Sequence, residues 1–339
     1  MVPVSRALRL GYKVSAEQFG PAELLGFTVA AEELGFDSAG ISDHLQPWRH
    51  TGGHAPFSLA WLGAAGQATR RIRLGTSVLT PTFRYHPAVV AQAMATLGCL
   101  FPGRMWLGVG TGESMNETPL GVEWPDSKER FARLKEAIEL IQRLWKNERV
   151  SFDGAFYRTR NATVYDRPET PIPIYVAAAG PSAARLAGRV ADGLICTSGK
   201  GMTLYSDTLL PAVTEGARAA GRDPVDIALM IEMKVSFDTD IERARDDTRN
   251  WSALALAPEE KTGVEDPMEM ERLADALSVD RAASRWIVSS DPDEHVERIR
   301  PYLDLGFTEL IFHAPGSDQR RFLELYSREV LPRLRALAG

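Results

Sequence analysis

The feature that most constrains the fold is a regular alternation of short apolar runs with amphipathic segments along the whole chain. The apolar runs cover residues 8–14, 36–41, 72–79, 104–109, 173–177, 193–196, 227–237 and 309–313. Segments with helical periodicity lie at residues 21–34, 57–69, 87–97, 127–146, 181–190, 202–220, 293–306 and 318–337. Eight strand patterns with intervening helices predict an α/β fold, the (β/α)8 TIM barrel, in which all strands run parallel.

The clearest helical pattern covers residues 127–146. Its apolar residues recur at spacings of three and four and form one stripe: Phe131, Leu134, Ile138, Ile141 and Trp145. Asp126 precedes this segment and Glu129 follows it by three residues, which is typical of a capped helix N-terminus.

A doubly wound sheet is the alternative architecture. Such a fold usually carries Gly-x-Gly-x-x-Gly after its first strand, and this chain has neither that pattern nor a Walker Gly-x4-Gly-Lys-Ser/Thr. The barrel is therefore favoured. Residues 238–285 are polar and hold helical fragments but no clear strand, so we expect a helical insertion at about 238–285 within a single domain spanning residues 1–339. Residues 286–289 form one further short strand-like run.

Composition and charge narrow the classes of function. The formal net charge is −6, and basic residues are mixed with acidic ones, whereas a general nucleic-acid binder clusters its basic residues on one face. No apolar stretch reaches membrane-spanning length, and residues 1–10 are too poor in apolar residues for a signal peptide. The two cysteines, Cys99 and Cys196, lie in apolar runs and are expected to pack in the core. We therefore expect a cytoplasmic protein with no nucleic-acid or membrane partner.

The residues after each predicted strand contain the chemistry-bearing groups. In a barrel these segments converge on one mouth, where binding and catalysis take place. The second strand is followed by Asp43, His44 and Trp48, and the fourth by a glycine-rich run that ends in Glu113. Small residues follow the third, fourth and fifth strands and let a flat ring approach the backbone closely. The mouth therefore suits a planar aromatic cofactor beside an acid–base pair.

His44 and Glu113 are the sharpest candidates for that pair. Neutral imidazole accepts a proton near working pH, and a carboxyl group in a glycine-rich loop can exchange a proton with a cofactor. A capping histidine and an ordinary loop carboxylate are the structural alternatives. Trp48 has the alternative of a core aromatic residue, because tryptophans are readily buried.

The run Thr-Ser-Gly-Lys-Gly at residues 197–201 resembles an anion cradle, with hydroxyls, a lysine and glycine amides before a helix. The same string also serves as an ordinary turn. The remaining histidines lack metal-ligand spacing, so no metal site is expected. Glu232 and Lys234 lie two residues apart on one strand face and are expected to form a salt bridge inside the barrel.

Six motifs spread along the chain carry a specific resemblance. They are Leu-Gly-Tyr-Lys with Ala-Glu-Gln-Phe at residues 10–19, Ser-Asp-His-Leu-Gln-Pro-Trp-Arg-His-Thr-Gly-Gly-His-Ala-Pro-Phe at 42–57, Leu-Gly-Thr-Ser-Val-Leu-Thr-Pro-Thr-Phe-Arg-Tyr at 74–85, Gly-Val-Gly-Thr-Gly-Glu at 108–113, Cys-Thr-Ser-Gly-Lys-Gly at 196–201 and His-Ala-Pro-Gly-Ser-Asp-Gln-Arg-Arg-Phe at 313–322. With these, the chain resembles the luciferase-like flavin and deazaflavin oxidoreductases, and within them the F420-dependent glucose-6-phosphate dehydrogenases.

The resemblance implies an enzyme that transfers a hydride from C1 of glucose 6-phosphate, or a related hexose 6-phosphate, to coenzyme F420, and that is usually a homodimer. It implies catalytic roles for His44, Trp48 and Glu113. It implies cofactor-binding roles for Asp43, Ser77, Val78, Thr80, Gly112, Asn116, Ala178, Ala179 and Gly180, with a cis peptide between Ser77 and Val78. It implies substrate-binding roles for Glu17, Thr197, Lys200, Lys261 and Arg285.

Three departures from the family pattern affect the expected sugar preference. Ala179 stands where the family has glycine, the loop over residues 117–124 is shorter, and Thr262 follows Lys261 where a histidine is familiar. Fructose or mannose 6-phosphate are therefore alternative substrates. Two other functions also stay open: an FMN- or F420-dependent luciferase-like oxidoreductase or monooxygenase acting on another substrate, and a non-catalytic deazaflavin-binding protein.

Overall fold

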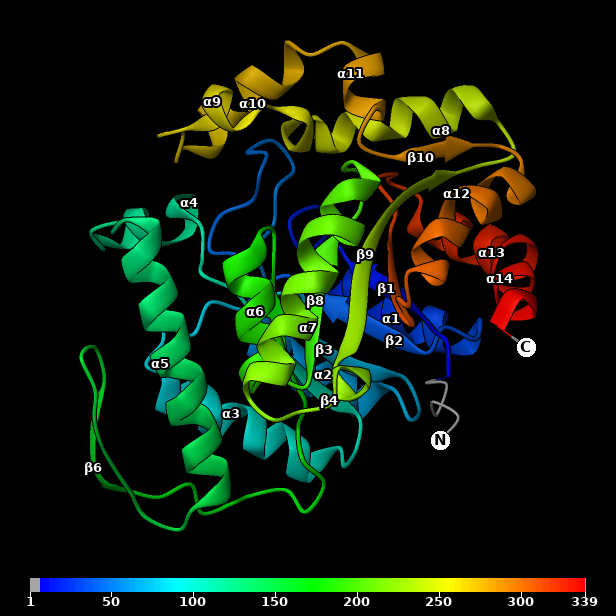
Figure 1. The fold of residues 1–339 in the computed structure, drawn as a ribbon. Helices are drawn as coiled ribbons and strands as arrows, with labels where there is room; N and C mark the ends of the chain where they lie inside the picture. Colours follow the sequence, from blue (N-terminus) through cyan, green and yellow to red (C-terminus); the bar gives the residue numbers. More distant parts are fainter. Residues whose placement is uncertain (1–6, 339) are drawn as a thin grey trace.

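The computed structural model describes residues 7–338, so the first six residues, on which the signal-peptide prediction partly depends, lie outside the described part. Eight parallel strands close into a barrel with helices around it (Figure 1). The strands are β1 (Arg9–Val14), β2 (Ser38–Ile41), β3 (Arg73–Thr76), β4 (Met105–Val109), β7 (Ile174–Ala177), β8 (Gly193–Thr197), β9 (Ala228–Phe237) and β11 (Glu309–His313). Pairing of β8 with β9 and of β1 with β11 closes the ring, which confirms the predicted (β/α)8 fold.

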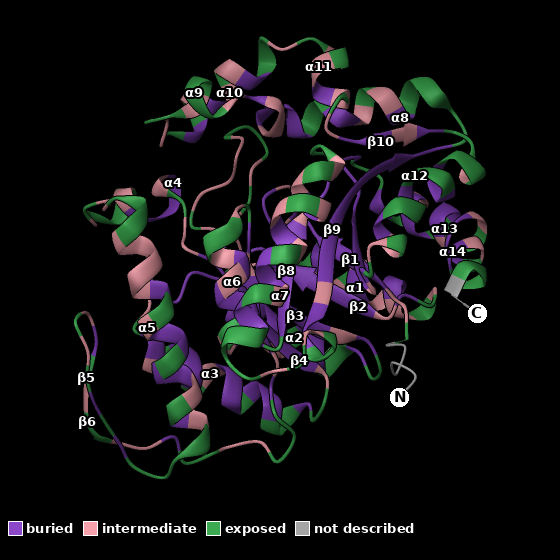
Figure 2. Cartoon of the chain, in the orientation of Figure 1, coloured by how far each residue is buried: buried purple, intermediate pink, exposed green. Residues whose placement is uncertain are grey.

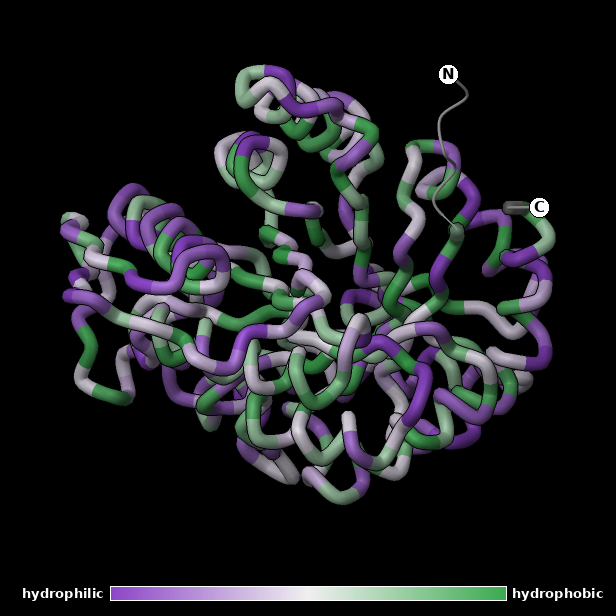
Figure 3. Tube along the Cα trace, turned by 90° about the horizontal axis from the view of Figure 1, so that it is seen from below, coloured by the Kyte–Doolittle hydropathy of each residue, from purple (hydrophilic) through white to green (hydrophobic). Residues whose placement is uncertain are grey.

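The outer layer consists of helices that pack on the barrel: α1 (Pro21–Glu33), α2 (Ser58–Ala68), α3 (Pro87–Leu100), α5 (Ser127–Lys146), α6 (Pro181–Val190), α7 (Leu210–Ala219), α12 (Pro292–Asp304), α13 (Gln319–Glu329) and α14 (Leu331–Ala338). In α5 the Asp126 side chain accepts a hydrogen bond from the Glu129 amide, as predicted, and Leu134, Ile138 and Ile141 are buried. Figure 3 shows hydrophilic and hydrophobic residues alternating along such outer helices, as an amphipathic layer requires.

The barrel interior is a packed core separate from the larger core between strands and helices. Trp106 and Tyr175 are its largest members, and Ile195, Ala228, Met230 and Ile311 complete it. Glycines on neighbouring strands make room for the two rings. A Cβ at position 75 would lie 2.3 Å from Trp106, and one at position 193 would lie 2.5 Å from Tyr175. Figure 2 shows the strands as the most continuously buried part of the chain. This core fills the barrel beneath its mouth and leaves the carboxyl ends of the strands open for a site.

Four expectations about local structure need correction. The strand predicted at 72–79 ends at Thr76, where the chain turns into a cis peptide between Ser77 and Val78. The helix predicted at 202–220 is a π-helical turn, Leu204–Leu209, followed by α7. An antiparallel hairpin, β5 (Val150–Asp153) and β6 (Arg158–Ala162), was not predicted. Cys99 is exposed on α3, whereas Cys196 is buried as expected.

Residues 238–285 form short helices that lie across the carboxyl ends of the strands (Figure 1). They are α8 (Ile241–Asp247), the 3-10 segment Thr248–Ala255, α9 (Pro258–Lys261), α10 (Pro267–Asp275) and α11 (Val279–Ala283), and the strand β10 (Ile287–Ser289) then pairs with the far end of β9. A small core of its own, with Leu256 and Met270, packs against Trp48. The boundaries of the insertion and the single domain stay predictions.

Candidate active site

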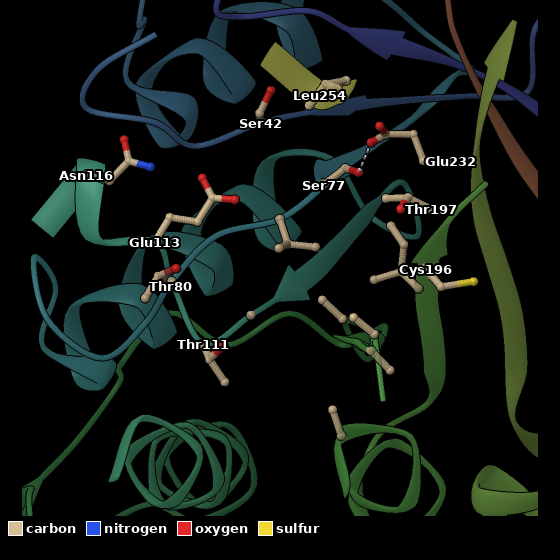
Figure 4. A pocket seen from close by; sticks show the side chains of 18 of the residues that line it. Ser42, Ser77, Thr80, Thr111, Glu113, Asn116, Cys196, Thr197, Glu232 and Leu254 are labelled. Carbon is tan, nitrogen blue, oxygen red and sulfur yellow. Dashed lines mark hydrogen bonds between the residues drawn. The ribbon is translucent and has the colours of Figure 1, made fainter. Parts of the chain in front are cut away.

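A cavity of about 980 Å³ lies at the mouth of the barrel, between the strand ends and the 238–285 helices. Every residue predicted for catalysis, cofactor binding or substrate binding lines it, although the residues come from eight different parts of the chain. Figure 4 shows Thr80, Glu113 and Asn116 on one side of this cavity and Ser77, Thr197 and Glu232 on the other. The convergence of strand ends thus brings the predicted site together.

His44 follows β2 and places its imidazole between two carboxylates. Its Nε2 atom lies 3.5 Å from Oε1 of Glu17 and 3.7 Å from Oε2 of Glu113. Its Nδ1 atom lies 3.3 Å from the Gln46 carbonyl oxygen, which can only accept, so Nδ1 carries the ring proton in the neutral form. The Nε2 lone pair is therefore free to accept a proton in the cavity, and the resulting imidazolium would have two negative neighbours.

The two carboxylates beside His44 differ in environment. Glu17 is buried, and its Oε2 accepts a hydrogen bond from Ser42 Oγ at 2.9 Å, which leaves Oε1 toward His44. The Glu113 side chain, by contrast, is 47% exposed and precedes α4 (Ser114–Glu117). Glu17 is thus held in the wall of the cavity by burial and by its hydrogen bond with Ser42, whereas Glu113 can exchange protons with solvent.

Trp48 joins the imidazole to the 238–285 helices. Its ring lies 5.9 Å from the His44 ring, and the ammonium of Lys261 on α9 lies 5.2 Å from the Trp48 ring centre. Arg49 extends this connection, because it forms ion pairs with Asp275 at 2.6 Å and with Glu271 at 3.0 Å on α10. The loop that carries His44 is therefore fastened to the segment that carries Lys261.

Asp43 lines the cavity but its carboxylate already has three protein donors. Ser58 Oγ, Tyr85 OH and Arg84 Nη2 donate to it at 2.6, 2.9 and 2.8 Å. Arg84 also pairs with the buried Glu117 at 3.2 Å. This network fixes the end of β2 where His44 begins.

Asn116, on α4, holds the next part of the same loop. Its Oδ1 accepts hydrogen bonds from the backbone amides of Leu45 and Gln46, at 2.8 and 3.2 Å. The buried Asn116 side chain thereby fixes the two residues that follow His44, including the Gln46 carbonyl that selects the imidazole tautomer.

Small residues form the floor of the cavity beside the cis peptide. The Lys13 ammonium donates to the Ser77 carbonyl at 2.6 Å and pairs with Glu232 at 2.9 Å, so the Ser77 backbone is held from below. Gly112 has φ of +85°, and a Cβ there would also meet Thr80 at 2.9 Å. A glycine is required at this point of the floor.

The segment after β7 supplies a second wall of small residues. Ala178 is buried and Ala179 exposed, and Gly180 caps the N-terminus of α6, whose first residues also line the cavity. A Cβ at position 180 would meet nothing within 4 Å, so the space beside it belongs to the cavity. The N-terminal amides of a helix are good donors to an anionic group there.

Four cations line one part of the cavity without a carboxylate ion pair among residues 7–338: Lys200, Lys234, Lys261 and Arg285. Burial, together with the Arg285 guanidinium, lowers the pKa of both Lys200 and Lys261, although the nearby Glu113 counteracts this for Lys261. Burial lowers the pKa of Lys234 to about 8. A cluster of cations that lack counter-ions, one of them the buried Lys234, indicates a binding site for an anionic ligand.

The expected salt bridge between Glu232 and Lys234 is wrong. Glu232 pairs with Lys13 on β1, and the lysine charge holds the pKa of that carboxylate well below its usual range despite burial. His313 Nδ1 lies 3.4 Å from the other Glu232 oxygen, between the rings of Trp251 and Trp286. Lys234 is left to face the cavity.

Sequence reasoning placed Lys13 at the mouth without a role, and it did not select several other lining residues for the site, among them Arg84, Lys234, Trp251 and His313. Lys13, Lys234 and His313 each interrupt an apolar strand pattern near its carboxyl end, and that signal alone could have found them. Among the described residues, no three His, Cys, Asp or Glu side chains gather as a metal site would require. Within residues 7–338 no helix combines the length and apolar character needed to cross a membrane.

Comparison with known proteins agrees with this geometry. Residues 6–309 match the family model described as luciferase-like monooxygenase. A protein of Nakamurella multipartita named F420-dependent glucose-6-phosphate dehydrogenase is 68% identical over 332 residues, which cover 98% of each chain. A protein of the same name from Beutenbergia cavernae is 69% identical, over 97% of this chain and 98% of its own.

Among solved structures, an F420-dependent secondary alcohol dehydrogenase in complex with an F420–acetone adduct superposes with a TM-score of 0.91. It is 31% identical in sequence and the match covers 97% of this chain and 99% of that one. An F420-dependent tetrahydromethanopterin reductase from Methanopyrus kandleri, 22% identical with a TM-score of 0.81, shares the fold. The chain therefore belongs to the luciferase-like monooxygenase family, in the group of its F420-dependent glucose-6-phosphate dehydrogenase relatives.

Proposed function

We propose that this protein is an F420-dependent glucose-6-phosphate dehydrogenase, which oxidises C1 of the sugar phosphate to 6-phosphogluconolactone and reduces coenzyme F420. The observation that carries the proposal is the shared cavity of His44 and the cations without counter-ions. A base at one end and an anion site at the other match a substrate that has a hydroxyl to deprotonate and a phosphate to anchor. The names of the close relatives supply the same substrate and cofactor.

The cavity fits the cofactor on its own structural features. Ser77, Val78 and Gly112 line the floor, and Gly112 has no side chain that would keep a planar ring from its backbone. The open space beside Gly180 lies at the α6 N-terminus, which suits an anionic tail. We assign cofactor binding to Asp43, Ser77, Val78, Thr80, Gly112, Asn116, Ala178, Ala179 and Gly180. When bound, F420 supplies the ring that accepts the hydride from C1.

His44 is the base in this mechanism. Its Nε2 takes the proton of the C1 hydroxyl as the hydride leaves C1, so the carbon is oxidised by two electrons and the oxygen becomes a carbonyl. Glu17 stabilises the imidazolium that forms, and the Trp48 ring forms the side of the pocket that encloses the sugar. Glu113, which exchanges with solvent, holds the proton for N1 of the cofactor ring. The two residues keep the proton count balanced.

Thr197, Lys200, Lys261 and Arg285 bind the phosphate. This group does not react, so its binding energy orients the distant C1 against the ring and the base. Ala179, which departs from the family pattern, lines the same cavity, and Thr262 follows the lining residue Lys261. We therefore expect any difference from the relatives to concern which hexose 6-phosphate is preferred. The homodimer and the cytoplasmic location stay predictions from the sequence.

The test is a steady-state assay of the purified protein with F420 and a panel of glucose, fructose and mannose 6-phosphates and unphosphorylated glucose. The proposal expects loss of oxidised-F420 absorbance with glucose 6-phosphate, and far slower loss with glucose. Reduction of FMN in place of F420 would instead identify the flavin-dependent alternative. Binding of F420 without turnover on any sugar phosphate would identify the non-catalytic one.

A further inference from the structure

Lys234 stands out among the cations of the cavity because its expected partner Glu232 pairs with Lys13 instead, and the names of the relatives assign it no role. It lies on β9 with its side chain inside the barrel, 4% exposed, and forms no carboxylate ion pair within the described part of the chain. An ammonium group buried in this way is costly unless a ligand supplies the missing negative charge.

The strand register places Lys234 directly beside the phosphate-binding run. Thr197 pairs with Glu232 across β8 and β9, so Lys234 is level with the residues that follow Thr197. Its backbone amide donates to Ser198 Oγ at 2.8 Å, and the Ser198 amide donates to the Glu232 carbonyl at 2.9 Å. The run that carries Thr197 and Lys200 is therefore hydrogen-bonded to β9 at Glu232 and at Lys234 itself.

We propose that Lys234 is a fourth cation of the phosphate site, whose ammonium group binds the dianionic phosphate of the sugar phosphate together with Lys200, Lys261 and Arg285. This inference rests on the proposed function and extends it. The carboxylate of Glu232 is not available as a partner for Lys234. One of its oxygens is paired with Lys13, and the other lies against His313.

The charged surroundings of Lys234 give the proposal a specific signature. The groups that face it are Glu232 on its own strand, Lys13 on β1, His313 on β11, Cys196 on β8, Lys200 in the next loop and Arg285 before β10. Burial first, and then the cations among them, hold the pKa of Lys234 at about 8 in the absence of substrate. A sugar phosphate is a dianion at this pH, because its second pKa is about 6.

Binding of the dianion raises the pKa of the neighbouring ammonium, so the protein takes up a proton when the substrate binds near pH 8. Calorimetry of glucose 6-phosphate binding to the cofactor-free protein, in buffers of different ionisation enthalpy, measures this uptake directly. The variants are Lys234→Met, Lys234→Arg and, as a matched control, Lys135→Met at an exposed position of α5.

We expect Lys234→Met to weaken glucose 6-phosphate binding about tenfold or more, the size of one hydrogen bond to a charged group. Lys234→Arg should keep the affinity but reduce proton uptake at pH 8, since arginine stays charged there. Lys135→Met should match the wild type. Wild-type affinity in Lys234→Met, or unchanged proton uptake in Lys234→Arg, overturns the proposal, and the arginine variant decides it even if the methionine variant does not fold.

The outcome separates this inference from the proposed function. If the wild type reduces no F420 but the two Lys234 variants change glucose 6-phosphate affinity and proton uptake as expected, the function is wrong and the assignment of Lys234 holds. If the wild type turns over and both lysine variants bind as it does, the assignment alone is wrong.

Discussion

The Nε2 atom of His44 lies 3.5 Å from Oε1 of Glu17, a buried carboxylate whose other oxygen is held by Ser42. The sequence-based interpretation placed Glu17 near the sugar, whereas the structure places it beside the base. A fixed negative charge next to Nε2 stabilises the imidazolium that proton abstraction creates, and its effect is largest in the transition state.

Glu17→Gln should therefore lower kcat about ten- to a hundredfold, the range expected when a hydrogen bond to a charged group is lost. The KM for glucose 6-phosphate should change far less. Glu33→Gln, an exposed carboxylate at the end of α1, is the matched control. Equal kcat values in Glu17→Gln and the control would exclude a role for Glu17 beside the base.

Lys261→Ala should act mainly on KM. The ammonium of Lys261 faces the phosphate site and also covers the Trp48 ring at 5.2 Å, so its removal weakens anchoring of a group that does not react. We expect KM to rise about tenfold or more, on the same scale of one charged hydrogen bond. Lys261→Arg, which keeps the charge, should recover most of the loss. A fall in kcat at unchanged KM would contradict this assignment.

The Arg49 ion pairs should couple the catalytic loop to the phosphate-binding helices. Glu271 binds Arg49 and also accepts hydrogen bonds from the His50 and Thr51 amides, at 3.1 and 2.9 Å. Because the guanidinium is partly exposed, the contribution is modest, of the order of a surface pair at about 0.2–1 kcal/mol. Arg49→Met should raise KM for glucose 6-phosphate several-fold and speed hydrogen exchange at the Thr51 amide.

Arg272→Met is the control for this coupling. Arg272 lies on the same helix as Glu271, but within the described residues its ion pair is with Glu269, at 2.6 Å, and not with the loop that carries His44. It should change neither KM nor exchange at Thr51. Equal behaviour of the two arginine variants would mean that the loop does not depend on the Arg49 contacts.

His295 should make the fold sensitive to acid. It packs between the rings of Phe237 and Tyr326, and burial lowers its pKa to about 4. The unfolded chain binds a proton at this histidine below about pH 6.5, whereas the folded chain does not until about pH 4. The stability that comes from the neutral ring is therefore fully present above pH 6.5 and is lost as the pH falls from there toward 4.

His295→Gln keeps a polar side chain but does not titrate. Between pH 7 and pH 4.5 the free energy of unfolding of this variant should therefore fall by about 2 kcal/mol less than that of the wild type. Urea unfolding at the two pH values measures this, and His54→Gln at an exposed position is the control. Parallel pH dependence in the wild type and His295→Gln would show that His295 does not carry the effect.

The fold was largely predictable because the barrel strands are buried on both faces and read as mostly apolar runs, interrupted by single polar residues such as Lys13 and Lys234. The exceptions have physical causes. The strand at 72–79 stops early because the chain turns at Ser77, which residue types alone do not reveal. The β5–β6 hairpin was not predicted because three of its residues in β6 are exposed, so it shows little apolar alternation.

The site was predictable in its members but not in their pairing. His44, Glu113 and the 197–201 run follow strands, which places them at the mouth, whereas Lys261 and Arg285 came from the resemblance alone. The partner of Glu232 could not be predicted, because Lys13 lies on β1, which is far from β9 in sequence and is separated from it in the barrel by β11. The two-residue spacing suggested Lys234 as the partner of Glu232, but Lys234 faces the cavity.

The role of His44 as the base can be measured by single-turnover reduction of bound F420 by glucose 6-phosphate in the wild type and His44→Ala. We expect rapid loss of oxidised-cofactor absorbance in the wild type. We expect a rate about 10²–10⁴-fold lower in His44→Ala, the usual contribution of a general base, with F420 affinity unchanged. A His44→Ala rate within a few-fold of the wild type would contradict the account, since the cavity would then oxidise the sugar phosphate without the base around which it is built.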